Sequence, residues 1–181
     1  WQGRALVSVV GFHFRRTRVL GVAIPGHSNF EEVNLRFYVR RPGPDGVMRR
    51  AVVFIRELVP RPAIAWTARW TYNEPYLAVP MAHAIALTAE AGGEAEYAWQ
   101  HRRVAFRLHA AVEGPASPLM PGSEAEFITE HYWGYTRQRD GGTIEYEVAH
   151  PSWRVWTART ATFTGDATKL YGADFAALLR Q

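Results

Sequence analysis

Hydrophobic and polar residues alternate along much of this chain, and a period of two is typical of β-strands whose faces meet different surroundings. Residues 31–41 show the pattern most clearly. One face of this predicted strand is apolar and carries Val33, Leu35, Phe37 and Val39. The other carries a polar row of Glu32, Asn34, Arg36, Tyr38 and Arg40. The apolar face predicts contact with a core, whereas the polar row is either an outer surface or the lining of a pocket.

Similar alternation, or enrichment in β-branched and aromatic residues, predicts strands at residues 5–14, 17–24, 31–41, 48–59, 82–91, 94–101, 104–112, 132–138, 143–150 and 153–163. Glycine-rich stretches at residues 42–46, 92–93 and 140–142 predict hairpin connections, because glycine accepts the positive φ of tight turns. Many strands with few helices predict a mostly β fold with an antiparallel, barrel-like sheet.

Three short helices are expected. Residues 62–72 start with a proline in the first turn, and Ser123 with Glu126 forms a capping box that opens a helix to about Glu130. Residues 173–180 have apolar residues at helical spacing. Trp66 and Trp70 lie four apart on the first helix, which favours core packing over an oligomer contact.

Composition narrows the class of protein. The chain has 181 residues with 48% hydrophobic and 21% charged residues, which fits one ordinary soluble domain. Its net charge is +4, but the arginines are scattered and lie near carboxylates, so nucleic-acid binding is not expected. No apolar run reaches the length of a membrane span. The absence of cysteine excludes thiolate chemistry and fits a cytoplasmic location.

Common catalytic motifs are missing. None of the seven histidines belongs to a paired ligand motif, so no metal site is expected. No GxSxG elbow and no phosphate-binding glycine loop occurs, and no cofactor is predicted. The remaining candidates are the polar row, the segment from Glu57 to Arg61, and the mixed acid, imidazole and aromatic stretch at residues 130–137. Cross-strand Arg–Glu pairs on a solvated sheet face are the plainer interpretation of these residues.

Three long segments resemble a known family: GFHFRRTRVLGVAIPGHSNFEEVNLRFYVRR, RRAVVFIRELVPRPAIAWTARWTYNEPY and FITEHYWGYTRQRDGGTIEYEVAHPSWRVW. They are similar to the YqjF-like family of uncharacterised bacterial proteins, domain of unknown function 2071. The resemblance covers most of the chain. It implies a single domain over residues 1–181 that lacks N- and C-terminal segments usual in the family.

That family is in turn similar to the acetoacetate decarboxylase superfamily, whose fold is a cone-shaped, closed, mostly antiparallel β-barrel around a buried pocket. The resemblance implies that the polar row faces this pocket. Phe30-Glu31-Glu32 looks like the superfamily's aromatic-x-Glu motif, with Glu32 as the pocket carboxylate. Ile55-Arg56-Glu57 followed by Pro60-Arg61-Pro62 resembles, with shorter spacing, the segment that carries the Schiff-base lysine.

The position of that lysine is occupied here by Arg61 or Pro62. Schiff-base chemistry needs an amine that can lose its proton, and a guanidinium cannot do so. Lys169, the only lysine, lies far from the motif in sequence. Decarboxylation through an imine is therefore not expected.

The sequence predicts a barrel that binds a small organic acid or aromatic compound, with a homo-oligomer as a further possibility. Catalytic candidates are Glu32, Glu57 and Arg61; ligand-binding candidates are Asn34, Arg36, Tyr38, His131, Trp133 and Tyr135. One hypothesis is a lysine-independent lyase, isomerase or hydrolase with a glutamate as acid or base and Arg61 as electrostatic stabiliser. A second is a sensor or carrier without turnover. A third is that Arg61 and Glu57 form a structural ion pair at the strand-to-helix junction.

Overall fold

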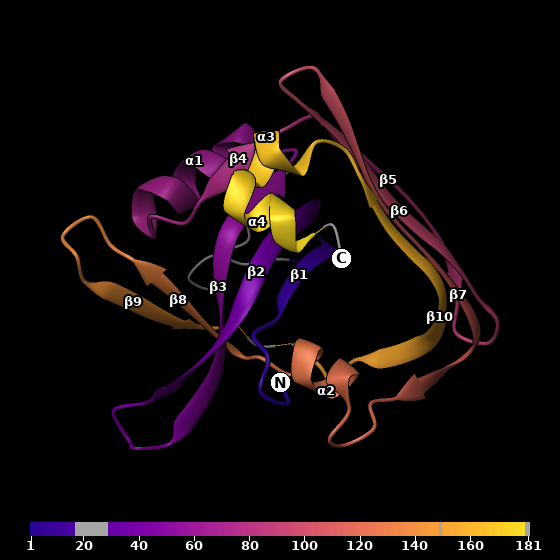
Figure 1. The fold of residues 1–181 in the computed structure, drawn as a ribbon, viewed down its shortest axis with the longest axis horizontal. Coiled ribbons are helices and arrows are strands. Elements are labelled where there is room, and N and C mark those ends of the chain that lie inside the picture. The colour runs from indigo at the N-terminus through magenta and orange to yellow at the C-terminus, as the bar shows by residue number, and fades with distance from the viewer. Residues whose placement is uncertain (17–28, 149, 180–181) are drawn as a thin grey trace.

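The computed structural model describes residues 1–16, 29–148 and 150–179. The strand predicted at residues 17–24 lies outside these ranges. The described residues form a mostly β fold with a few short helices, as the alternation predicts (Figure 1). No helix in the described ranges has the length and apolar character needed to cross a membrane.

The first sheet holds six strands. Its main path runs β1 (Val7–Phe14), β2 (Phe30–Pro42), β3 (Met48–Val59), β8 (Trp133–Arg137) and β9 (Thr143–Glu147). The short strand β4 (Tyr76–Ala78) also pairs with β3. One edge of β3 is therefore shared, with β4 beside residues 57–59 and β8 beside residues 51–52, and both of these pairings are parallel.

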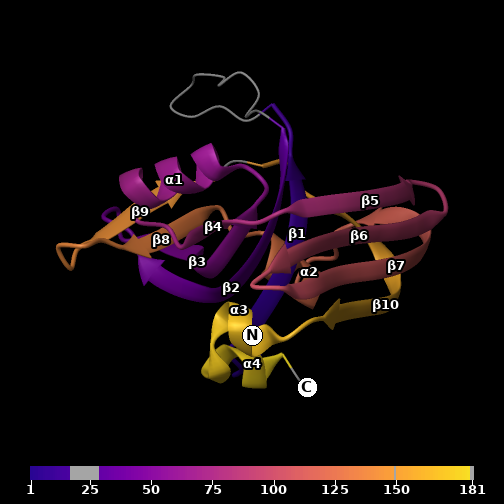
Figure 2. The ribbon, with the colours of Figure 1, turned by 90° about the horizontal axis from the view of Figure 1, so that it is seen from above.

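The second sheet is fully antiparallel and follows the order β10 (Arg154–Thr164), β7 (Val104–Pro118), β6 (Gly92–His101) and β5 (Met81–Thr88). It faces the first sheet across the molecule (Figures 1 and 2). The predicted mostly antiparallel β fold is therefore confirmed. Within the described residues neither sheet closes on itself, and the closed barrel stays a prediction. Gly92 and Gly93, predicted as a turn, instead open β6 opposite Thr88 and Leu87.

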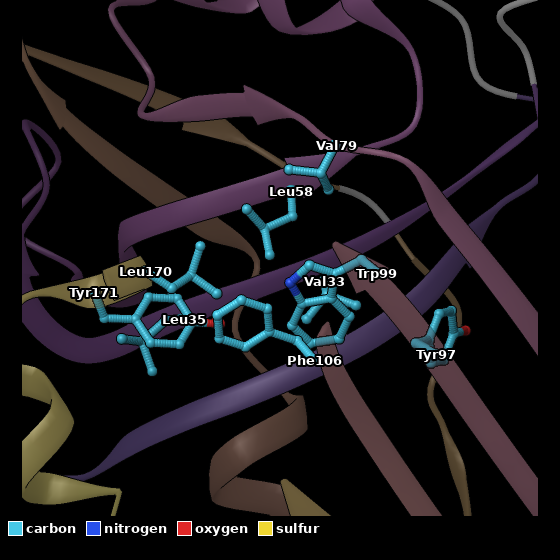
Figure 3. Packing of buried hydrophobic residues seen from close by; sticks show 9 residues of the cluster. All are labelled: Val33, Leu35, Leu58, Val79, Tyr97, Trp99, Phe106, Leu170 and Tyr171. Carbon is cyan, nitrogen blue, oxygen red and sulfur yellow. The ribbon is translucent and has the colours of Figure 1, made fainter. Parts of the chain in front are cut away.

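The main core lies between the two sheets (Figure 3). Val33, Leu35 and Leu58 come from the first sheet, and Trp99 and Phe106 come from the second. The rings of Trp99 and Phe106 are stacked with their centroids 5.6 Å apart. The inner part of the apolar face of β2, Val33 and Leu35, therefore meets a core as predicted, whereas Phe37 and Val39 are half-buried. Glu32 and Asn34 of the polar row point to the opposite face of the strand.

Four helices complete the described fold. They are α1 (Pro62–Thr71), α2 (Glu124–Thr129), α3 (Ala167–Tyr171) and α4 (Ala173–Leu178). The first two lie where the sequence predicts them, and Ser123 accepts the predicted capping bond from the Glu126 amide. The C-terminal helix is shorter than predicted and is preceded by α3, because Gly172 with φ of +84° separates the two.

The expected use of the α1 tryptophans is wrong. Trp66 and Trp70 are 67% and 68% exposed, and their rings stack on each other at 6.1 Å. The buried face of α1 is formed instead by Ala65, which packs with Phe30 and Val59. A small residue at this position lets the helix approach the sheet closely.

Candidate functional site

Three glutamates are buried together on the polar side of the first sheet. Glu32 comes from β2, Glu57 from β3, and Glu74 from the segment between α1 and β4, and their exposed fractions are 1%, 2% and 6%. We call them, with the polar residues around them, the carboxyl cluster: Glu32, Asn34, Glu57, Glu74, Tyr76, Thr136 and Tyr146. Its members come from β2, β3, β4, β8, β9 and one connecting segment.

Strand register brings the first members together. Asn34 lies directly opposite Glu57 in the β2–β3 ladder, and Glu57 lies beside Tyr76 in the parallel β3–β4 pair. The Asn34 side-chain amide donates to Glu32 Oε1 at 3.0 Å, and the Tyr76 hydroxyl donates to Glu32 Oε2 at 2.8 Å. Both oxygens of Glu32 therefore accept a hydrogen bond.

The β8–β9 hairpin covers Glu74. The hydroxyls of Thr136 and Tyr146 both donate to Glu74 Oε1, the latter at 2.6 Å. Tyr146 can lie flat over β8 because Gly134 is opposite it in the ladder, and a Cβ on Gly134 would come within 2.3 Å of the tyrosine ring. Gly134 therefore leaves the space that the Tyr146 ring occupies when its hydroxyl donates to Glu74.

Burial without a counter-ion changes the protonation of these acids. In the described part of the chain, no arginine, lysine or histidine forms an ion pair with any of the three glutamates. Desolvation raises the pKa of Glu32 to about 7, and hydrogen bonds from Asn34 and Tyr76 limit that rise. Burial and the charges of Glu32 and Glu74 raise the pKa of Glu57 well above its usual range. Burial also raises the pKa of Glu74.

Two buried oxygens of the cluster have no hydrogen-bond partner among the described residues. They are Glu57 Oε2 and Asn34 Oδ1, which belong to neighbouring side chains in the β2–β3 ladder. A buried polar atom without a partner costs free energy, typically ~1–3 kcal/mol. A buried water or a bound polar molecule can supply the missing partner at such atoms.

An open groove lies beside the outer end of the cluster. Its volume is about 500 Å³, and its lining residues are Trp70, Asn73, Gln138, Arg139, Asp140, Gly142, Thr143 and Ile144. Gln138 follows the end of β8 two residues after Thr136, Ile144 lies in β9 two residues before Tyr146, and Asn73 immediately precedes Glu74. The groove therefore adjoins the residues that cover Glu74, and none of the three glutamates lines it.

A family model described as an uncharacterized conserved protein, domain of unknown function 2071, matches residues 1–180. The chain belongs to this family. No curated protein and no solved structure matches the chain significantly. The predicted family is confirmed, and the wider link to acetoacetate decarboxylases stays a prediction.

The outer half of the polar row lies apart from the carboxyl cluster and anchors α2. Arg36 donates to the Ile128 carbonyl at 3.1 Å and to the Tyr38 hydroxyl at 3.4 Å. Arg50 donates to the Phe127 carbonyl at 2.9 Å. These guanidiniums satisfy carbonyls at the C-terminal end of a short helix, where positive charge is favourable.

His131 lies in the same anchoring group. Its ring is buried 4.8 Å from that of Tyr38, measured between centroids. Burial, together with the charges of Arg50 and Arg36, lowers the pKa of His131 to about 4. The imidazole is therefore neutral near pH 7.

The other sequence candidates also lie away from the three acids. Arg61 is exposed at the residue before α1, and among the described residues it forms no ion pair with Glu57. Trp133 and Tyr135 point to the face of β8 opposite Thr136. There Arg49 stacks on Trp133 at 4.0 Å and Tyr135 donates to Glu145 at 2.5 Å.

The candidates from the sequence include three members of the cluster, Glu32, Asn34 and Glu57, whose role stays a prediction. They do not include the other four members: Glu74, Tyr76, Thr136 and Tyr146. Glu74 stands between Asn73 and Pro75, so its surroundings in sequence are typical of a loop. Tyr76 belongs to a three-residue strand that is too short to show alternation. Thr136 and Tyr146 do alternate with their neighbours, but alternation does not reveal which sheet face receives them.

Proposed function

We propose that this chain binds a small, uncharged organic molecule at the carboxyl cluster and transfers a proton on it. The observation that carries the proposal is the set of three buried glutamates without a counter-ion, next to two buried oxygens without partners. Among the described residues, unpartnered polar atoms also occur in the main core, at Trp99 Nε1 and the Tyr171 hydroxyl, so the three uncompensated acids are what distinguishes this cluster. The proposal places the polar end of the molecule at the acids and the rest of it in the adjoining groove, where Trp70 and Ile144 offer apolar contacts.

The charge of the site favours a neutral substrate. An anion would approach three carboxyl groups, while the nearest row arginine, Arg36, is already engaged with the Ile128 carbonyl. A carbonyl compound fits better, because protonated Glu57 can donate to its oxygen and Asn34 Oδ1 can accept from a neighbouring hydroxyl or amide. This revises the anionic ligand suggested by the sequence.

The reaction that these groups support best is proton transfer at a carbon next to a carbonyl, as in a lysine-independent isomerase. The ionised Glu32 carboxylate removes a proton from that carbon, and the C–H electron pair forms a C=C bond. Glu57 gives its proton to the carbonyl oxygen, which yields a neutral enol. Return of the proton from Glu32 to the same carbon, with return of the enol proton to Glu57, completes the exchange cycle. In a hydroxyketone the enol is an enediol, and Glu32 can instead protonate the former carbonyl carbon while the hydroxyl on the first carbon gives its proton to Glu57, which yields the isomer.

Hydrogen–deuterium exchange tests this proposal directly. The protein is incubated in D₂O with a panel of small aliphatic and aromatic ketones and hydroxyketones, and loss of the α-proton signal is followed by NMR. We expect catalysed exchange with wild type and with the control variant Glu90→Gln, which alters an exposed turn residue. Glu32→Gln and Glu57→Gln should each lower the rate about 10²- to 10⁴-fold, the usual contribution of a positioned acid or base.

Thermal-shift binding with the same panel separates the alternatives. A compound that stabilises wild type without any exchange would favour the second candidate function, a non-catalytic sensor or carrier with the same pocket. If no compound binds or exchanges and Glu57→Gln is less stable than wild type, the cluster is a structural network and the proposal is wrong.

A further inference from the structure

A second polar group lies on the opposite side of β2 from Glu32, at the junction of the two sheets. It consists of His13 from β1, Glu31 from β2 and His83 from β5. His13 and Glu31 are directly opposite each other in the antiparallel β1–β2 ladder. The third residue comes from the other sheet, whose strand β5 contacts β2 where His83 meets Glu31.

The nitrogen and oxygen atoms converge. His83 Nδ1 lies 2.6 Å from Glu31 Oε1, and His13 Nδ1 lies 3.9 Å from the same oxygen. One ligand atom from each residue can be chosen so that all lie within 4.8 Å of one another. Ligands at about 2.0–2.1 Å from a tetrahedral zinc ion are about 3.4 Å apart. The observed separations lie on either side of that value, so small side-chain rotations suffice.

We propose that His13, Glu31 and His83 bind a divalent first-row transition metal, with zinc as the principal candidate. Two imidazoles and one carboxylate form an established donor set for such ions. In the described part of the chain the ion-pair partners of Glu31 are these two histidines. The ion would join the two sheets at their junction.

The surroundings fit a site that is held in place but reachable. The side chains of His13, Glu31 and His83 are 28%, 17% and 35% exposed. Beneath them the Tyr97 ring lies against Gly11, and a Cβ at Gly11 would come within 2.7 Å of that ring. The centroids of the Tyr97 and His83 rings are 6.3 Å apart. Partial exposure leaves further coordination positions for water or a substrate group.

The three ligands lie on separate strands, which explains why the sequence shows no paired ligand motif and predicts no metal site. A second His–Glu pair provides a matched control. His109 Nε2 lies 3.5 Å from Glu94 Oε2, and the Glu94 side chain is 70% exposed. Among the described residues this pair has no third potential ligand close enough to complete a metal site.

The test is titration of the EDTA-treated full chain with Zn²⁺ by calorimetry and with Co²⁺ by visible absorption. We expect one ion per chain, a Co²⁺ spectrum typical of nitrogen and oxygen ligands, and a higher melting temperature with Zn²⁺. His83→Ala and Glu31→Gln should lower the affinity at least 10-fold, and His109→Ala should leave it unchanged. Affinity should also fall as pH is lowered from about 7.5 to about 5.5, because a ligating imidazole must be deprotonated.

The alternative is an ordinary His83–Glu31 hydrogen bond. Absence of saturable binding at one ion per chain in wild type, or unchanged binding by His83→Ala, would overturn the proposal. Circular dichroism of each variant in EDTA controls for folding, and His83 is exposed enough for alanine to be tolerated.

Discussion

Glu32 and His131 are buried groups whose pKa values shift in opposite directions. Both shifts favour the uncharged form of the side chain. The pKa of Glu32 rises from 4.5 to about 7, and that of His131 falls from 6.5 to about 4. Each shift couples protonation to folding. The native state therefore binds more protons than the unfolded chain at Glu32, and fewer at His131.

The sign of each contribution follows from these shifts. Glu32 stabilises the fold fully below about pH 4.5, and this contribution is lost as pH rises through about 7, by an amount on the order of 3 kcal/mol. His131 acts in the reverse sense, since its contribution is present above pH 6.5 and is lost as pH falls toward 4. Between about pH 4.5 and 6.5 the two effects oppose each other.

We therefore expect Glu32→Gln and His131→Gln to change the pH dependence of stability in opposite ways. The free energy of unfolding, measured by urea denaturation from pH 4.5 to 7, should rise more steeply with pH in Glu32→Gln than in wild type. It should fall more steeply with pH in His131→Gln. Glu90→Gln, on the surface, should follow wild type. Parallel curves for all four proteins would contradict the assigned shifts.

At the scale of elements, the β8–β9 hairpin determines how the carboxyl cluster is covered. Its Gly134 lies opposite Tyr146, whose hydroxyl donates to Glu74. An added methyl group at Gly134 would overlap the tyrosine ring, with a Cβ as close as 2.3 Å. Overpacking of this kind usually costs ~1–3 kcal/mol.

Gly134→Ala should therefore destabilise the protein by about this amount. It should also displace Tyr146 from Glu74 and reduce any exchange activity. Gly142→Ala in the same hairpin is the matched control, because its Cβ would meet only the flexible Asp140 side chain, at 3.1 Å. Equal melting temperatures for the two variants would show that Tyr146 adjusts at no cost.

Elements with strong local signals are those that the sequence predicts well. The strand at residues 48–59 has the predicted boundaries, and Ser123 caps α2 as its capping box indicates. Pairing between distant segments has no such signal. β4 and β8 pair with the same edge of β3, and this arrangement brings Glu74 and Thr136 towards Glu57. It depends on contacts between residues that are tens of positions apart in the sequence. Three of the seven members of the carboxyl cluster were therefore candidates from the sequence, and four were not.

At the scale of the whole molecule, the C-terminal helices connect the two sheets. Leu170 and Tyr171 from α3 pack in the main core with Leu35 of the first sheet and Phe106 of the second (Figure 3). The chain thus returns at its end to fill the space between sheets that were formed much earlier in the sequence. The helix was missed by sequence reasoning because it is five residues long.

This arrangement predicts unequal effects for two leucines of neighbouring helices. Leu170 is 4% exposed and Leu178 is 51% exposed. Leu170→Ala leaves a cavity between the sheets and should cost about 2–5 kcal/mol in the free energy of unfolding, whereas Leu178→Ala should cost less than about 0.5 kcal/mol. Guanidinium denaturation followed by both fluorescence and circular dichroism measures the two values.

The same experiment tests whether the sheets unfold together. If α3 joins them into one cooperative unit, both probes should give a single coincident transition in wild type and in Leu170→Ala, at a lower midpoint in the variant. Transitions that separate only in Leu170→Ala would mean that each sheet holds its own structure and that the helix supplies the link between them. A loss of stability in Leu178→Ala equal to that in Leu170→Ala would contradict the packing itself.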